Sequence, residues 1–203
     1  MSATEELLPA PTTTPSQRET RRWGWLVMGA GAIGIVSGSI TVVDKISLLK
    51  DPAAGSFCDI SSSVGCTPVL LAWQSSVLGP PNALLGVIMF AILGTAGAVV
   101  ATNGRLAAGF HNAMLGLSVF FALFLTWYMY EVAYSIGSLC PFCTVCAASV
   151  LATVAGTNRL AAAHGSGWPQ RMAGRLAADG WDVLIVLGWG AVIAAMLFAG
   201  IWL

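Results

Sequence analysis

The sequence predicts an all-α integral membrane protein: a bundle of four transmembrane helices, a fifth transmembrane helix, and an external loop with an interfacial half-helix. Two observations predict this class. Hydrophobic residues make up 57% of the 203-residue chain and charged residues only 9%, whereas a typical soluble domain is about 25% charged. The scarcity of charged residues argues against a soluble enzyme. Nine Lys and Arg residues balance nine Asp and Glu residues, so we also expect no nucleic-acid-binding protein.

Long uncharged segments mark the predicted helices. A helix needs roughly 20 apolar residues to cross the hydrocarbon core of a bilayer. The segments that meet this length cover residues 23–43, 82–102, 106–130, 132–158 and 183–203. Pro141 predicts that the fourth helix begins partway along its segment. Gly34 and Gly38 form a GxxxG pattern, which is typical of close helix packing.

The remaining segments complete the predicted organisation. Residues 1–22 are a predicted disordered cytoplasmic tail, residues 23–162 the four-helix domain, and residues 163–182 a cytoplasmic loop. Residues 44–81 form the predicted external loop. Its apolar part, residues 69–78, is too short to span a bilayer and predicts the interfacial half-helix, after which Asn82 is the predicted N-cap of the next helix.

The distribution of Lys and Arg predicts the orientation, because cytoplasmic segments carry more of them. With the N-terminus in the cytoplasm, Lys45 and Lys50 lie outside and every arginine lies inside. These arginines are Arg18, Arg21, Arg22, Arg105, Arg159, Arg171 and Arg175. We therefore expect a multi-pass protein of the inner or plasma membrane. Its cysteines, at positions 58, 66, 140, 143 and 146, would all lie on the oxidising side, where disulfides persist.

Cys140 and Cys143 form a CxxC motif at a predicted helix start. Proline is favoured at the first helical position, so Pro141 makes Cys140 the cap and places Cys143 in the first turn. Unpaired backbone N–H groups and the helix dipole stabilise a thiolate there, and thiol pKa values in such places fall from ~8.5 toward 3.5–7.5. Because the thiolate is the species that attacks disulfides, the motif indicates a redox-active pair.

Cys58 and Cys66 form a second pair in the external loop, and two pairs on one membrane face predict a relay by thiol–disulfide exchange. We expect no metal site, because these two cysteines are poorly spaced as zinc ligands and both histidines fall on the cytoplasmic side. Cys146, among apolar residues, is expected to be an ordinary buried cysteine. The sequence carries no flavin, haem or nucleotide motif, which leaves a quinone in the bilayer as the expected electron acceptor.

Three stretches in this order resemble the bacterial vitamin K epoxide reductase family: residues 58–66, 69–82 and 136–143. The resemblance covers about residues 23–160. It implies a four-helix bundle around a quinone, which would be a menaquinone, a phylloquinone or a ubiquinone, and it implies a thiol-oxidising oxidoreductase. Family members in bacteria reoxidise a thioredoxin-fold protein. Because this chain ends directly after the fifth helix, the implied partner is a DsbA-type thioredoxin-fold protein that acts in trans.

The resemblance also implies roles for the cysteines. Cys58 would exchange with the partner's thiols, Cys66 would form a transient bridge to Cys140, and Cys143 would lie against the quinone. Further candidates for the quinone pocket are aromatic residues near helix ends and one hydroxyl. They are Phe142, Phe57, Trp127, Tyr130, Phe90 and Ser76.

The chain departs from the family pattern at Ala72, where many members carry Ser or Thr. Ser75 or Ser76 would then supply a hydroxyl one turn later, and quinone reduction is favoured over epoxide reduction. Glu131 could relay a proton, although a residue that faces lipid headgroups is the simpler interpretation. Two other functions stay open: vitamin K epoxide or quinone reduction as the main activity, and a non-catalytic membrane protein whose disulfides only hold the loop.

Overall fold

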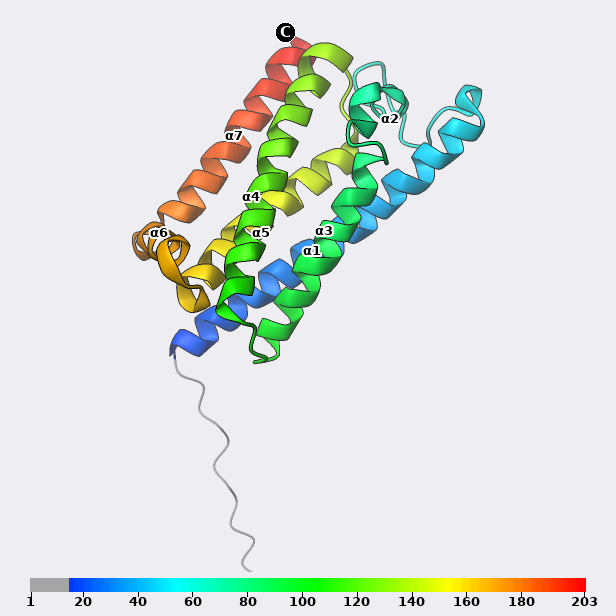
Figure 1. Ribbon diagram of the computed structural model, residues 1–203. Coiled ribbons are helices and arrows are strands. Elements are labelled where there is room, and N and C mark those ends of the chain that lie inside the picture. Colours follow the sequence, from blue (N-terminus) through cyan, green and yellow to red (C-terminus); the bar gives the residue numbers. More distant parts are fainter. Residues whose placement is uncertain (1–14) are drawn as a thin grey trace, which may run out of the picture.

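A computed structural model describes residues 15–203 as a bundle of helices (Figure 1). Five helices are long and apolar enough to cross a membrane, which confirms the all-α membrane fold. They are α1 (Pro15–Lys50), α3 (Asn82–Ala101), α4 (Ala108–Glu131), α5 (Pro141–His164) and α7 (Trp181–Trp202). α1 packs against α3 and α5, and α5 packs against α4. α7 lies beside α4 and α5 and is the least buried of the five.

The bundle has two different ends. The segment between α1 and α3 and the turn between α4 and α5 meet at one end, which we call the cysteine end. The C-terminus lies at the same end, whereas α6 (Gly167–Ala178) lies at the opposite one (Figure 1). The predicted orientation of these ends across the membrane stays a prediction.

α1 is longer at both ends than the sequence predicted. The predicted disordered tail, residues 1–22, is wrong for residues 15–22, which are helical; residues 1–14 lie outside the described residues. At its other end α1 continues through Asp44 and Lys45 to Lys50, although these residues were assigned to the external loop. Charge ended the predicted segments, but Arg, Glu, Gln and Lys are good helix formers and continue a helix beyond its apolar part.

The predicted half-helix of residues 69–78 is instead two short pieces. They are α2 (Thr67–Leu71) and the 3₁₀ turn η2 (Trp73–Ser76), separated by Ala72, whose ψ of 143° is extended. Val69 and Leu70 are buried, whereas Trp73 and Leu78 are exposed, so this segment closes the cysteine end and keeps one apolar side outward. A second 3₁₀ turn, η1 (Pro52–Ala54), follows α1.

Pro81, not Asn82, occupies the N-cap position of α3. Asn82 is the first helical residue, and its Nδ2 donates a hydrogen bond to the carbonyl oxygen of Gln74 at 2.6 Å. Asn82, which the sequence predicted as the cap, therefore connects α3 to η2 instead. It holds η2 over the end of the bundle.

Glycines bring α1 and α3 into close contact. A Cβ atom on Gly31 would lie 2.6 Å from the Cα of Gly94, and one on Gly34 would lie 2.5 Å from the ring of Phe90. Gly38 faces Val87 in the same way, at 2.8 Å. These contacts confirm that the GxxxG pattern serves helix packing.

The predicted cytoplasmic loop of residues 163–182 contains a helix, α6. α7 follows and is fixed to the bundle near its start and close to its middle. Asp182 accepts hydrogen bonds from Arg159 Nε at 2.5 Å and Nη2 at 2.7 Å, and the indole N–H of Trp189 donates to Thr126 Oγ1 at 2.8 Å. Asp182 is buried, so this ion pair is a specific connection between α5 and α7.

Candidate redox site

The carboxylate of Asp59 organises the loop that carries Cys58 and Cys66. Its Oδ1 accepts hydrogen bonds from the backbone N–H of Cys66 at 2.8 Å and of Thr67 at 3.0 Å. Its Oδ2 accepts from the backbone N–H of Ser56 at 3.0 Å and from the Thr67 hydroxyl at 2.6 Å. Partial burial raises the pKa of this carboxyl, but these hydrogen bonds together hold it below its usual value.

A short backbone pairing brings the loop to the start of α5. The N–H of Gly65 donates to the carbonyl of Leu139 at 3.0 Å, and the N–H of Leu139 donates to the carbonyl of Ser63 at 2.9 Å. This pairing is an isolated parallel bridge between Val64 and Leu139. It sets Cys66, two residues after Val64, beside Cys140, one residue after Leu139.

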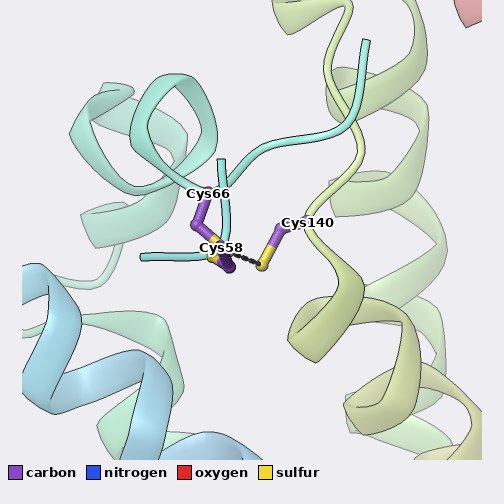
Figure 2. A group of neighbouring side chains, drawn as sticks. All are labelled: Cys58, Cys66 and Cys140. Atoms are coloured by element: carbon purple, nitrogen blue, oxygen red, sulfur yellow. Dashed lines mark hydrogen bonds between the residues drawn. A yellow bond between two sulfur atoms is a disulfide. The ribbon is translucent and has the colours of Figure 1, made fainter. Parts of the chain in front are cut away.

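Three sulfur atoms therefore converge at the cysteine end (Figure 2). Cys58 and Cys66 form a disulfide, and the Sγ of Cys66 lies 3.1 Å from the Sγ of Cys140. The three Sγ atoms all lie within 4.8 Å of one another. While the disulfide is closed, Cys140 carries the free thiol of the group, so the arrangement brings a nucleophile to a disulfide, as thiol–disulfide exchange requires.

Cys140 occupies the N-cap position of α5 and Pro141 its first helical position, as the sequence predicted. The backbone N–H of Cys143 points at the Cys140 sulfur, 3.4 Å away. A hydrogen bond from the Cys143 side chain lowers the pKa of the Cys140 thiol most, and backbone N–H groups of Cys143 and Phe142 add to the effect. Burial and the negative charge of Asp44 act in the opposite direction without cancelling this lowering.

An apolar cavity lies on the inner side of the CxxC motif. α5 lines it with Cys143, Cys146 and Val150, which follow one another at helical spacing. α4 adds aromatic residues, among them Tyr128, and α3 adds Phe90. A mostly apolar lining with a few polar groups is typical of small-molecule sites, and the wall of this cavity carries the second cysteine of the motif.

Comparison with known families identifies the chain. The family model described as the vitamin K epoxide reductase family matches residues 25–157, which include the loop, both cysteine pairs and most of the first four membrane helices. The chain belongs to the vitamin K epoxide reductase family. No curated protein and no solved structure matches it. As a member of this family it is a membrane oxidoreductase whose chemistry concerns disulfides.

Apart from Ser75, which the sequence offered together with Ser76 as a hydroxyl for the quinone, the polar part of the cavity in this family member was not predicted from the sequence. α1 contributes Thr41 and the buried Lys45, and Ser75 and Asn82 lie at the same wall. The Oδ1 atom of Asn82 is buried and has no hydrogen-bond partner within the described residues. An unpaired acceptor is costly inside a protein, so this oxygen is open to a ligand hydroxyl. The regular spacing of Gly38, Thr41 and Lys45 on one helix face was the available signal.

Only one of the aromatic residues predicted for the quinone pocket lines the cavity. Phe90 lines it, but Trp127, Tyr130, Phe57 and Phe142 do not. Residues 121, 124, 125, 128 and 129 form the inward face of α4, so positions 127 and 130 fall on other faces of the helix. Phe57 and Phe142 instead contact one another, with ring centroids 5.6 Å apart, and Phe57 is exposed.

Three other residues named from the sequence also have definite positions. Ser76 does not line the cavity, but its hydroxyl accepts a hydrogen bond from Lys45 Nζ at 2.5 Å. Glu131 accepts a hydrogen bond from Gln74 Nε2 at 3.1 Å, so it holds η2. Cys146, expected to be an ordinary buried residue, lines the cavity together with Cys143.

Asp44, like Lys45, is a buried charged residue that the sequence prediction placed in the external loop. Its carboxylate accepts a hydrogen bond from the Ser56 hydroxyl. The Ser56 oxygen lies 3.1 Å from the Cys58 sulfur, and that sulfur lies 3.9 Å from Asp44 Oδ2. The disulfide thus has a carboxylate on the side of Cys58 and a thiol on the side of Cys66.

Proposed function

We propose that this protein is a membrane thiol oxidase that passes electrons from a DsbA-type thioredoxin-fold partner, acting in trans, to a quinone. It would thereby support disulfide formation in secreted proteins. The observation that carries the proposal is the 3.1 Å separation of the Cys66 and Cys140 sulfurs. This contact connects a loop disulfide to a CxxC motif whose second cysteine lines an apolar cavity.

Electrons enter at the loop disulfide. The partner's dithiol reduces Cys58–Cys66 and leaves as a disulfide. The Cys66 thiolate then attacks Cys140 of an oxidised CxxC pair, which forms a Cys66–Cys140 bridge and releases Cys143. Cys58 attacks Cys66, reforms the loop disulfide and releases Cys140. The low pKa of Cys140 favours this last step, because a thiol of lower pKa is the better leaving group.

The reduced CxxC pair then transfers two electrons and two protons and closes again as a disulfide. A quinone is the acceptor that fits the cavity, because its ring and tail suit the apolar walls. The unpaired oxygen of Asn82 suits a hydroxyl of the product hydroquinone. A menaquinone, a phylloquinone or a ubiquinone would supply the two-electron acceptor.

The proposed orientation places the cysteine end outside the cytoplasm. The positive-inside rule supports it, since Arg105 and Arg159 lie in or beside the ends of helices opposite the cysteine end. Disulfide exchange with a secreted partner requires this orientation, because cytoplasmic thiols are kept reduced.

Trapping the bridge tests the proposal. In cells whose only copy carries Cys143→Ser, the Cys140 thiol should attack Cys66 of the closed loop disulfide and release Cys58. The resulting Cys66–Cys140 bridge should accumulate, because no Cys143 thiol remains to attack Cys140 and release Cys66. Peptide mapping without reduction would detect the bridge. Cys146→Ser is the matched control, since Cys146 lines the same cavity but has no place in the exchange, and it should not accumulate the bridge.

The trapping experiment and an assay of the purified protein distinguish the two alternative functions. Absence of the bridge together with normal disulfide formation in secreted proteins would contradict the relay. It would favour a protein whose loop disulfide is only structural. An intact relay in which epoxide reduction by the purified protein outpaces thiol oxidation by a thioredoxin-fold partner would instead favour epoxide reduction as the main activity.

A further inference from the structure

Lys45 is a charged residue inside the membrane bundle. Its side chain is 6% exposed and lines the cavity on the same face of α1 as Gly38 and Thr41. A charged group within a transmembrane helix is expensive to bury and usually has a functional partner. Within the described residues, no carboxylate forms an ion pair with Lys45, so its charge is balanced by hydrogen bonds alone.

The hydrogen bonds of Lys45 leave one donor unused. Its Nζ donates to Ser75 Oγ at 2.6 Å and to Ser76 Oγ at 2.5 Å. Ser75 directs its own hydroxyl hydrogen at the carbonyl oxygens of Leu70 and Ala72, at 2.8 and 2.6 Å, so its oxygen is an acceptor toward Lys45. An ammonium group has three N–H donors. Two are satisfied by the serines, and the third is available at the cavity wall.

We propose that Lys45 is the anion-binding group of the cavity, and that its ammonium donates the third N–H to a ring oxygen of the bound quinone. This inference rests on the proposed function. Reduction by a dithiol moves two electrons and two protons, so the overall step is dithiol plus quinone to disulfide plus hydroquinone. A thiolate delivers electrons ahead of protons, and negative charge therefore develops on the ring oxygens. Lys45 stabilises that charge until the thiol protons arrive.

The chemical class of ligand follows from this role. The cavity should bind an anionic hydroxyquinone more tightly than a neutral quinone of the same size, because a charge-assisted hydrogen bond is stronger than a neutral one. If Lys45 served only to hold Ser75 and Ser76 in place, both ligands would respond equally to its removal. The difference between the two ligands therefore reports the charge itself.

The test measures binding, not turnover, with the purified full chain in lipid nanodiscs and its cysteines oxidised. The probes are 2-methyl-1,4-naphthoquinone, which is neutral, and 2-hydroxy-1,4-naphthoquinone, which is an anion at neutral pH. Lys45→Met should weaken binding of the anion by about 10-fold or more and that of the neutral quinone by less than about 2-fold. Lys50→Met is the matched control, because Lys50 is exposed at the end of the same helix, and it should change neither affinity.

A second variant covers the case in which methionine prevents folding. Lys45→Gln keeps donors for Ser75 and Ser76 without the charge, and it should lose the same preference for the anion. Equal loss for both ligands, or no loss for either, would overturn the inference and leave the proposed function standing. Failure of the unchanged protein to bind either quinone would remove the proposed quinone site and this inference with it.

Discussion

Asp59 shows how one exposed side chain organises the reactive loop. Its carboxylate accepts four hydrogen bonds, from Ser56, Cys66 and both donors of Thr67. These bonds close the loop around the disulfide and orient Cys66 toward Cys140. The pKa of Asp59 lies below its usual value because these bonds outweigh the effect of burial, so the ionised form is the one that holds the loop.

Protonation of Asp59 should therefore loosen the loop. A carboxyl whose pKa is lowered by folding stabilises the folded loop above the unfolded pKa, and this contribution is lost as the pH falls through the lowered value. We expect reduction of Cys58–Cys66 by a phosphine reductant to accelerate as the pH falls below about 4, with half-times followed by thiol labelling. Asp59→Asn should show the faster rate already at pH 7.

Asp51→Asn is the control for this prediction. Asp51 lies in the same loop, but its carboxylate accepts a hydrogen bond from the backbone N–H of Ala53, at 3.1 Å, and not from the residues that Asp59 holds. Its substitution should leave the reduction rate at pH 7 unchanged. If Asp59→Asn and the unchanged protein were reduced at equal rates at every pH, Asp59 would not control access to the disulfide.

Residues whose role is local could be predicted from the sequence, and those whose role is tertiary could not. Cys140 and Pro141 form a cap because proline fixes the helix start through its own backbone. Asp44 and Lys45 were taken to mark the end of a membrane segment. Their burial depends on hydroxyl groups that lie 12 to 31 residues further along the chain. No local sequence pattern indicates these hydrogen-bond partners.

At the scale of elements, the close contact between α1 and α3 depends on glycines, which have no side chain to keep the helices apart. Gly31→Ala should destabilise the protein, because the new Cβ would lie 2.6 Å from Gly94 Cα and 3.0 Å from the Phe90 carbonyl oxygen. Both are backbone atoms that cannot turn aside, so the helices must separate. We expect a loss of about 1–3 kcal/mol, measured as a lower midpoint of thermal unfolding in detergent.

Gly29→Ala is the matched control, because nothing lies within 4 Å of a Cβ at this position of the same helix. Alanine is a better helix former than glycine by about 1 kcal/mol, so this variant should be neutral or slightly stabilised. Equal midpoints for the two variants would show that α1 and α3 do not pack as closely as the structure has them.

The five membrane-spanning helices were predictable here, but their ends and the short helix α6 were not. The five spans follow from the length of uncharged segments, which bilayer thickness sets. The break of the expected half-helix at Ala72 follows from contacts that hold each piece separately. Val69 and Leu70 are buried in the core, whereas Ser75 is held by Lys45. A run of apolar residues in the sequence does not indicate such tertiary contacts.

At the scale of the whole molecule, α7 is an addition to the bundle that carries the site. The family match ends at residue 157, before α6 and α7, and the cavity is lined by residues from position 38 to position 150. α7 is nevertheless attached specifically. Arg159 pairs with Asp182, and it also lies over the ring of Trp23 in α1, 5.1 Å from its centroid, so one guanidinium connects three helices.

Loss of this connection should lower the stability of the protein without impairing its thiol oxidation. Asp182→Ala leaves Arg159 without its buried partner, and breaking such a pair costs about 3–5 kcal/mol. We expect a lower unfolding midpoint and faster proteolysis between α6 and α7, while thiol oxidation at low temperature stays within about 2-fold of the unchanged protein. Asp179→Asn, at an exposed neighbouring position, should behave like the unchanged protein in both assays. A large loss of thiol oxidation in folded Asp182→Ala protein would instead give α7 a part in the chemistry, because α7 would then reach the cavity through a contact with α4 or α5.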